Sequence, residues 1–575
     1  KPFGSGDFIF GSGVLTDGST QTAIALASGT GAKLRLDGAA ELVMSLGDTW
    51  TVGPSDATSS SLVRTPGLGG ILVLSEAGGL NTTVPVIVNG GVETYENGLV
   101  KGPIFSYTRN GSSDANYHYE LMKYDAEKGL VEATDLYNPG LEGGADAIAY
   151  LNVATAEYAV PENETRSARA VVVFGSARTD IPLTVNAGAI LKVGDGANPA
   201  PFILNRVGGY GGVRIDGSGT IDFGTSEGVF AVNNRTEQGD THNTRINPVI
   251  AGSGGVTFYG ALGASYPFVF VNNDNTYSGG TWITGVQIRP KTAGAFGTGL
   301  VDVGGSYSSG GQVRFVTDGL TFTNDFKLKG YGVKGYDNGI DYTDNGALFF
   351  AVSTKLTGAV EIDGSARVTT RNAEASVRGE LAGVVSGGKL KLMRGGEAAV
   401  VLSNHNTYTG GTEVVASTLA LKYGDSAGTG EIWADSSAIV FENADDIIVS
   451  NRFSATGTVK LRGEGGVKFA ALGDVSGAML DVDGGIRPLA DLPDGFPVCT
   501  NSAALPATLA LAEGVNRMPC DLAGEFILQV DSDAILNLGG RTVTVKKIKG
   551  RGALGVVNGE LIAPPRNMGL MMIVR

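Results

Sequence analysis

The sequence predicts an all-β chain that winds into a right-handed parallel β-helix, or β-solenoid, with glycine-rich turns. Three observations lead to this fold class. A seven-residue phrase occurs twice, with its downstream spacing preserved. Glycine, at 89 of 575 residues, separates short runs of Val, Ile, Leu and Thr. No stretch of useful length shows the 3.6-residue period of a helix. Repetition of this kind marks a unit that buries its apolar face only against copies of itself.

The repeated phrase is NTYSGGT at residues 275–281 and NTYTGGT at residues 406–412. Gly-Thr-Gly follows each copy at the same interval, at residues 297–299 and 428–430. Paired glycines allow positive φ at a corner, and asparagine can bond backbone groups there or stack as a ladder on asparagine of the next turn. We expect the tyrosine to pack beneath the corner. The residues that define these turns are Asn275, Tyr277, Gly279, Gly280, Asn406, Tyr408, Gly410 and Gly411.

Both copies resemble the autotransporter-associated β-strand repeat, because asparagine, an aromatic residue, a double glycine and a downstream Gly-Thr-Gly coincide twice. The resemblance is strong over about residues 270–432 and 530–562 and weaker elsewhere. It implies a passenger-type β-helix of a secreted, surface-displayed bacterial protein. It supplies a location and a fold but no activity, since these repeats are a scaffold.

The chain is expected to hold one long solenoid with interruptions. At about 20–25 residues per turn, it would form about 23–29 turns. Aromatic and charged residues rise near residues 101–170, where we expect an irregular excursion or small subdomain. The predicted parts are an N-terminal solenoid at 1–100, the excursion at 101–178, the main solenoid at 179–494 with repeats at about 270–303 and 401–432, a Cys-flanked loop at 495–525, and C-terminal strands with a joining tail at 526–575.

Cys499 and Cys520 are the only cysteines and flank a segment rich in Pro, Ala and Leu. We predict a disulfide that closes this loop, worth about 3 kcal/mol in the chain-entropy model and suited to an oxidising compartment. Two separately buried thiols are the alternative. Two cysteines and three scattered histidines do not predict a metal site.

The charge balance excludes some partners. The chain has 43 basic and 58 acidic residues, a net charge of −15, which disfavours nucleic acid and anionic lipid. No run approaches the roughly 20 apolar residues of a transmembrane helix. The chain begins at Lys1 without a signal segment, so we expect a mature secreted or surface protein whose export signal was removed; a shortened chain is the alternative.

The histidines His118, His242 and His405 share no motif with a serine or cysteine nucleophile. His405 lies in the repeat turn, where the other copy has Asp274, and we expect it to be structural. The sequence contains no Gly-x-Ser-x-Gly or His-Glu-x-x-His motif. We therefore predict no catalytic residue and no cofactor.

Acidic clusters are possible sites, because β-helices also host polysaccharide lyases and glycosidases, which use paired carboxylates. The candidates are Asp337, Asp341 and Asp344, Asp445 with Asp446, and Asp481 with Asp483. The first group would suit Ca²⁺ but lacks the spacing of an EF-hand. Strand alternation places Asp481 and Asp483 on one face, which we expect to be the outer, wet face.

A finite solenoid has two open ends with unpaired backbone groups. Apolar residues 7–10 and a C-terminal strand are the predicted joining elements, and head-to-tail contact between them yields an open filament. We therefore expect an extracellular structural protein, a subunit of a self-associating surface fibre or surface layer. A monomeric adhesin or passenger stalk that binds a cell-surface glycan, and a glycan-active enzyme, are the alternatives. The predicted assembly tail is Leu570, Met571, Met572, Ile573 and Val574.

Overall fold

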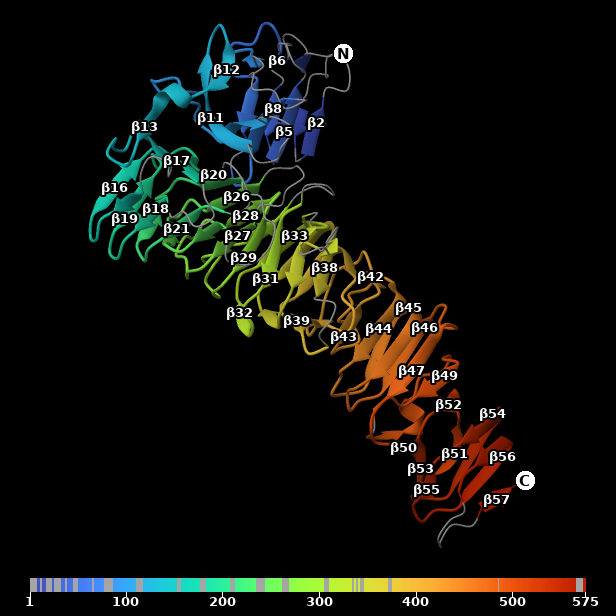
Figure 1. Ribbon diagram of the computed structural model, residues 1–575. Coiled ribbons are helices and arrows are strands. Elements are labelled where there is room, and N and C mark those ends of the chain that lie inside the picture. The colour runs from blue at the N-terminus through green and yellow to red at the C-terminus, as the bar shows by residue number, and fades with distance from the viewer. Residues whose placement is uncertain are drawn as a thin grey trace. The chain divides into compact units, whose positions relative to one another are not determined.

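The computed structural model confirms an all-β β-solenoid of parallel stacked sheets, with about 16 turns (Figure 1). Contacts divide the chain into two compact units, residues 1–349 and 350–575, which are described separately. Their described residues contain strands and short 3-10 turns but no α-helix. The structure describes residues 8–10, 13–16, 23–24, 33–36, 39–44, 50–64, 67–76, 86–109, 117–152, 157–175, 182–206, 212–233, 244–260, 268–304, 310–333, 336–337, 340–341, 346–370, 375–483, 485–564 and 572–574.

The first unit opens with three turns of three strands, here called the N-terminal stack. Strands pair in parallel from turn to turn, with Leu34 opposite Leu62 and Trp50 opposite Val86. Buried leucines and valines fill the interior. The strands are β1 (Phe8–Phe10), β2 (Gly13–Thr16), β3 (Ala23–Ile24), β4 (Leu34–Leu36), β5 (Ala39–Met44), β6 (Trp50–Val52), β7 (Leu62–Arg64), β8 (Ile71–Glu76) and β9 (Val86–Val88).

An antiparallel meander then closes the last turn of the N-terminal stack. β10 (Ile104–Arg109) lies parallel to β8, β11 (Tyr117–Asp125) is antiparallel to β10, and β12 (Gly129–Glu132) is antiparallel to both β11 and β9. This meander is the predicted excursion. It ends earlier than predicted, because parallel stacking resumes at residue 137 although glycine is sparse there.

The main stack of the first unit has three sides. Its turns are long at first and then shorten: Val171 pairs with Phe202, 31 residues on, whereas Ile283 pairs with Val303, 20 residues on. These long turns explain why the number of turns is smaller than predicted. One side contains β13 (Tyr137–Pro139), β14 (Ile148–Asn152), β17 (Ala170–Gly175), β20 (Ala200–Arg206), β23 (Gly228–Asn233), β26 (Val256–Gly260), β28 (Thr281–Thr284), β30 (Val301–Val303) and β33 (Phe326–Gly330).

The other two sides differ in length. The third side stops at its fourth strand. Inside the turns, Phe202, Phe230 and Phe258 of the first side follow one another with ring centroids 5.1 and 5.2 Å apart. The second side contains β15 (Tyr158–Val160), β18 (Leu183–Val185), β21 (Arg214–Asp216), β24 (Thr244–Ile246), β27 (Phe268–Val271), β29 (Gln287–Pro290) and β31 (Gln312–Phe315); the third contains β16 (Thr165–Ala168), β19 (Ile190–Val193), β22 (Thr220–Asp222) and β25 (Val249–Ala251). The short elements η2 (Thr134–Leu136), β32 (Leu320–Phe322), β34 (Tyr336–Asp337) and β35 (Ile340–Asp341) complete this unit, and β36 (Leu348–Phe350) lies at its boundary.

The second unit has shorter, more even turns. Thr412 pairs with Ile432 and Ile432 with Phe453, 20 and 21 residues apart, as the sequence predicts. The strands are β37 (Thr354–Leu356), β38 (Val360–Thr370), β39 (Arg378–Leu381), β40 (Val385–Met393), β41 (Ala399–Leu402), β42 (Thr412–Val415), β43 (Thr418–Leu421), β44 (Ile432–Phe441), β45 (Ile447–Leu461), β46 (Val467–Leu472), β47 (Ala478–Val482), β49 (Val498–Thr500) and β52 (Asp521–Ala523).

Two four-stranded sheets finish the second unit. In both, the strands pair in parallel, with Ile527 opposite Lys547 and Leu554 opposite Met572. The first sheet is β48 (Ile486–Pro488), β50 (Ala507–Leu511), β53 (Phe526–Val530) and β55 (Lys547–Lys549); the second is β51 (Gly514–Arg517), β54 (Ala534–Thr544), β56 (Leu554–Ile562) and β57 (Met572–Val574), and η4 (Leu489–Asp491) precedes β49.

Candidate functional site

The first copy of the repeated phrase stacks on β25, the last strand of the third side of the main stack. Thr276 N donates to Ile250 O at 2.9 Å, as the next parallel strand would. The side chain of Asn275 supplies the remaining bonds: Oδ1 accepts from Ile250 N, and Nδ2 donates to Ala295 O, both at 2.7 Å. One buried amide therefore joins three successive turns.

The second copy has the same geometry. Asn406 Oδ1 accepts from Val385 N at 2.7 Å, and Nδ2 donates to Ser426 O at 2.6 Å. The expectation that these asparagines bond backbone at a corner is confirmed. An asparagine-on-asparagine ladder does not form at either position, because the oxygen and the nitrogen of each side-chain amide already form hydrogen bonds with backbone groups of adjacent turns.

The tyrosines pack beneath the corners, as predicted. Tyr408 is fully buried, and its hydroxyl lies 2.6 Å from Thr412 Oγ1. Gly428, in the downstream Gly-Thr-Gly, has φ of +62°, and a Cβ there would lie 2.2 Å from Tyr408 O. The first copy repeats this arrangement. The Tyr277 hydroxyl lies 2.7 Å from Thr281 Oγ1, and a Cβ on Gly297 would lie 2.1 Å from Tyr277 O.

The two glycines of each pair serve different purposes. Gly280 and Gly411 adopt positive φ, at +94° and +82°. Gly279 and Gly410 do not, so the expectation of positive φ holds only for the second glycine of each pair. A Cβ on Gly279 would lie 2.3 Å from Gly255 N. The first glycine is needed because adjacent turns approach too closely for a side chain.

Asn324 and Asn451 are structural residues that the sequence reasoning missed. Asn451 is 2% exposed, and its Nδ2 donates to Gly428 O at 3.1 Å and to Gly430 O. Asn324 bonds Gly297 O and Gly299 O at 3.1 and 2.9 Å. A signal was present in the sequence: Asn324 and Asn451 both open an Asn-x-Phe phrase one turn after Gly-Thr-Gly.

The two corners differ at their exposed positions. His405 is stacked on Tyr423, with ring centroids 4.2 Å apart, and its Nδ1 lies 2.7 Å from Asp425 Oδ1. In the first copy, Asp274 Oδ1 accepts from Gly294 N at 2.9 Å instead. Both arrangements tie the corner to the next turn. His405 therefore contributes structural contacts to its corner, as predicted.

The acidic candidates are not assembled into one site. Asp481 is 2% exposed and forms an ion pair with Arg462 at 2.5 Å, so the expectation that it lies on a wet face is wrong. The partly exposed Arg462 covers the carboxylate and compensates its charge. Hydrogen bonding to Ser502 and Arg462 outweighs burial and lowers the pKa of Asp481. Asp446 Oδ1 accepts from Gly466 N at 2.7 Å, which ties one turn to the next.

The remaining candidates can be placed only in part. Asp337 and Asp341 lie on β34 and β35, which pair antiparallel, and Asp344 and His242 fall outside the described residues. No group of three or more His, Cys, Asp or Glu side chains suited to a metal occurs in the described part of the chain.

The most perturbed carboxyl group of the meander is Glu120 on β11. Burial raises its pKa to about 7, and it is 5% exposed. Tyr137 donates its hydroxyl to Glu120, and Glu132 adds a repulsive charge. His118 Nε2 lies 3.5 Å from Glu120 Oε1. Sequence reasoning did not single out this carboxyl, because its burial depends on the meander.

A seam joins the N-terminal stack and meander to the side of the main stack within the first unit. Tyr119 lies 5.8 Å from Tyr259 between ring centroids, and the side chain of Asn205 accepts from Tyr119 N and donates to Tyr119 O at 2.8 and 2.7 Å. Arg64 forms an ion pair with Glu227, whose side chain is 6% exposed. The seam therefore holds a partly buried charge pair as well as apolar contacts.

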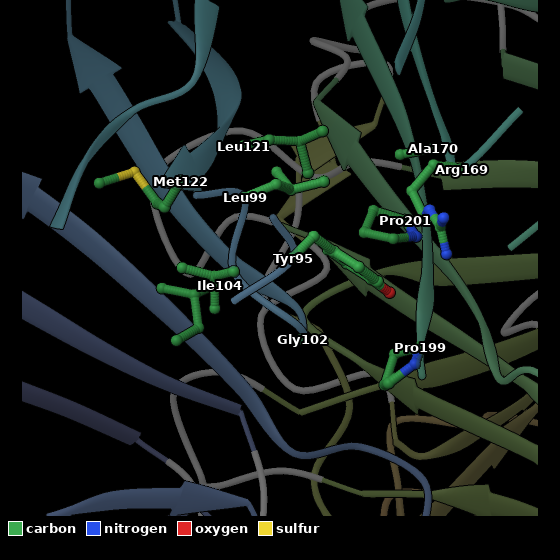
Figure 2. Close-up of a pocket in the computed structure, with 11 residues that line it drawn as sticks. Tyr95, Leu99, Gly102, Ile104, Leu121, Met122, Arg169, Ala170, Pro199 and Pro201 are labelled. Carbon is green, nitrogen blue, oxygen red and sulfur yellow. The ribbon is translucent and has the colours of Figure 1, made fainter. Parts of the chain in front are cut away.

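Figure 2 shows Tyr95 in this seam, with Arg169 and Pro201 on one side and Leu99 and Ile104 on the other. The Tyr95 hydroxyl donates to Asp195 at 2.8 Å, and the Arg169 guanidinium lies 4.4 Å from the tyrosine ring centroid. The adjoining cavity measures about 10 Å³, room for about one water. Because its polar groups satisfy one another, this cluster stabilises the seam.

A larger groove runs beside β7, the last strand of its three-stranded sheet. Its volume is about 260 Å³. Its lining includes the apolar side chains of Leu36, Leu62 and Ile104 and the charged side chains of Glu93 and Lys101. The volume is below the roughly 300–1,000 Å³ typical of small-molecule sites.

Cys499 and Cys520 are free, buried thiols, so the predicted disulfide is not formed in this structure. The segment around them is not a loop: it contributes β49 to β52, and Val498 pairs with Asp521 in parallel. The thiols are nevertheless neighbours, because Cys499 lies on β49 and Cys520 directly precedes β52, the parallel partner of β49. A hydrogen bond with Cys520, followed by burial, raises the pKa of Cys499. They are not separately buried.

The predicted assembly tail is described only in part. Met572, Ile573 and Val574 form β57, which adds in parallel to β56 of the same chain, whereas Leu570 and Met571 lie outside the described residues. At the other end, Phe8 to Phe10 form β1, the first strand of its sheet.

Comparison with known proteins gives no family. No family model matches the chain, and no curated protein matches it. Among the described residues, no helix is both long enough and apolar enough to cross a membrane. The class that the structure defines is therefore a β-solenoid.

Proposed function

We propose that this chain is a secreted or surface-displayed structural protein, whose copies join end to end into a fibre or surface layer. The observation that carries the proposal is the kind of edge at the ends of its stacks. β16 begins a parallel sheet, and β55 and β57 end two others. Such edges present backbone groups in the geometry that already joins one turn to the next.

The C-terminal strand supports this role. β57 continues the parallel register of the sheet, with Met572 opposite Leu554 and Val574 opposite Val556. It therefore extends the stack and exposes a parallel edge of its own. A strand from a second copy that pairs there repeats an existing interaction, and because the two contacting surfaces differ, the assembly stays open.

Location belongs to the proposal as well. The resemblance of residues 275–281 and 406–412 to the autotransporter-associated repeat supports export to the bacterial surface. The corner geometry gives each motif residue a scaffolding contact, in keeping with a repeat that builds the fold. No residue of the motif is left for catalysis, and we propose no enzymatic activity.

Negative-stain electron microscopy of native surface material beside the isolated chain tests the function. We expect filaments, and we expect a chain lacking residues 564–575 to form far fewer. Thermal unfolding of the shortened chain is the control for a general loss of structure. Single particles at all concentrations would refute self-assembly.

An adhesin is the second candidate, and the groove beside β7 favours it. Its mixture of apolar and charged lining residues is compatible with a surface glycan, the partner expected of a monomeric stalk. A glycan-array screen with wild type and Lys101→Ala tests this candidate, because binding that is insensitive to the substitution would remove the groove from consideration.

A further inference from the structure

The first turn of the main stack carries an acidic edge. Between residues 140 and 169 the chain has five carboxylates and two guanidinium groups, a net charge of −3. Arg166 pairs with Glu142 and Glu164, and Arg169 pairs with Asp146, so Glu157 and Glu162 are the carboxylates outside these ion pairs. Glu157, Glu162 and Glu164 flank β15 and β16 and are exposed. Figure 1 shows β16 at the outer end of the stack, with β19 next to it.

The last turn of the second unit has the opposite sign. Between residues 545 and 564 there are four cationic side chains and one carboxylate, a net charge of +3 in a chain whose total is −15. Lys547 and Lys549 lie on β55, the last strand of its sheet, and Arg551 follows in the turn. Lys547 and Arg551 are exposed. Lys546 already pairs with Glu525 at 2.6 Å.

We infer that these two edges are the joining surfaces of the fibre: the basic edge at β55 of one copy docks on the acidic edge at β15 and β16 of the next. The occupant is a second copy of this chain, chosen by charge complementarity. This inference rests on the proposed function and deepens it, because it assigns the joint to charged edges of the solenoid.

The sign of each edge explains why assembly proceeds in one direction. Charged residues on an edge strand oppose pairing with a like edge, so neither acidic-to-acidic nor basic-to-basic joints form. Opposite edges attract, and strands that pair lie about 4.8 Å apart, well within the Debye length of about 8 Å at physiological salt. The joint is therefore both selective and polar.

Salt and charge reversal test the inference. Filament formation by wild type is followed by light scattering at low and high NaCl, where we expect at least a tenfold slower onset at high salt, on the order expected for electrostatic steering. A basic-edge variant, Lys547→Glu/Lys549→Glu, is expected to lose assembly. A matched control, Lys128→Glu/Lys468→Glu, makes the same change in net charge at exposed sites away from both edges and is expected to assemble like wild type.

A compensating variant makes the test specific. Glu157→Lys/Glu162→Lys reverses the acidic edge, and combining it with Lys547→Glu/Lys549→Glu inverts both partners of the joint. We expect each single reversal to fail and the combined variant to recover assembly to within about threefold, because attraction is restored with opposite polarity. Circular dichroism of every variant tests whether it is folded.

The outcomes separate the two claims. If wild type never assembles, the proposed function fails and the inference with it. If wild type assembles but the basic-edge variant assembles equally well, the function stands and the charged joint is refuted. Failure of the combined variant to recover, while folded, refutes the pairing of these two edges.

Discussion

Replacing Asn406 with alanine should loosen the second repeat corner strongly, because this side chain alone satisfies two buried backbone groups. Truncation leaves Val385 N and Ser426 O without the bonds now formed at 2.7 and 2.6 Å. Each buried group left unsatisfied costs about 1–3 kcal/mol. The expected loss for the two is about 2–6 kcal/mol, of which Asn406→Asp should recover the part that depends on the Val385 bond.

Hydrogen exchange measures this loss where it occurs, because a solenoid opens locally and not as one body. We expect exchange at the Val385 amide to rise about 30- to 20,000-fold, the equivalent of that free energy at about 1.4 kcal/mol per tenfold. Turns remote from the corner should keep their protection. His405→Ala is the neighbouring control: His405 is exposed, and surface changes usually stay within about 0.5 kcal/mol.

The reasoning fails if Asn406→Ala changes protection at Val385 by less than threefold. It also fails if Asn406→Ala and His405→Ala have equal effects, because the loss would then reflect general disturbance of the corner. Asn275→Ala should reproduce the effect at Ile250, since Asn275 makes the same pair of bonds in the first unit.

Three further predictions concern other parts of the chain. Gly428→Ala should destabilise the second unit by more than about 2 kcal/mol, because its Cβ would lie 2.2 Å from Tyr408 O. Gly364 also has a positive φ, +69°, but open space around it, so Gly364→Ala should cost only about 1 kcal/mol for the left-handed conformation. Equal denaturation midpoints for the two variants would contradict this. Burial raises the pKa of Glu120 from 4.5 to about 7, so the folded state binds the proton more tightly than the unfolded state does. The free energy of unfolding should therefore fall by up to about 3 kcal/mol as pH rises from about 4.5 to about 7. Glu120→Gln should flatten this dependence in denaturant titrations. Cys499 and Cys520 should form the predicted disulfide when the chain is exposed to oxidised glutathione, since their thiols are neighbours, and intact-mass measurement should show a loss of about 2 Da; unchanged mass after prolonged exposure would rule the bond out.

Local sequence signals predicted the parts of the fold that depend on neighbouring turns. Glycine spacing and the repeated phrase identified the corners at Asn275 and Asn406, because a corner's hydrogen bonds reach only to adjacent turns. The shorter turns of the second unit also matched the expected length. Where chemistry repeats at a fixed interval, the sequence states the contact directly.

Features that depend on distant segments were not predicted. The Cys499 region looked like a loop because Pro and Ala break the alternation, yet Leu509 and Cys499 are buried as strand residues. Asp481 reads as an exposed strand residue until Arg462, one turn away, is placed beside it. Glu120 and Glu227 are buried only because the N-terminal stack and its meander pack against the main stack, and no local period encodes that contact.

The asparagine corners also determine how the solenoid responds to pulling force. The hydrogen bonds that join one turn to the next point along the stacking direction, so tension applied along the stack is borne by these bonds directly. A turn held only by its backbone ladder has one set of bonds to break, whereas a turn that also contains Asn275 or Asn406 must lose the side-chain bonds that reach the turns before and after it. Each such asparagine distributes load over three turns, and rupture should begin at turns that lack one.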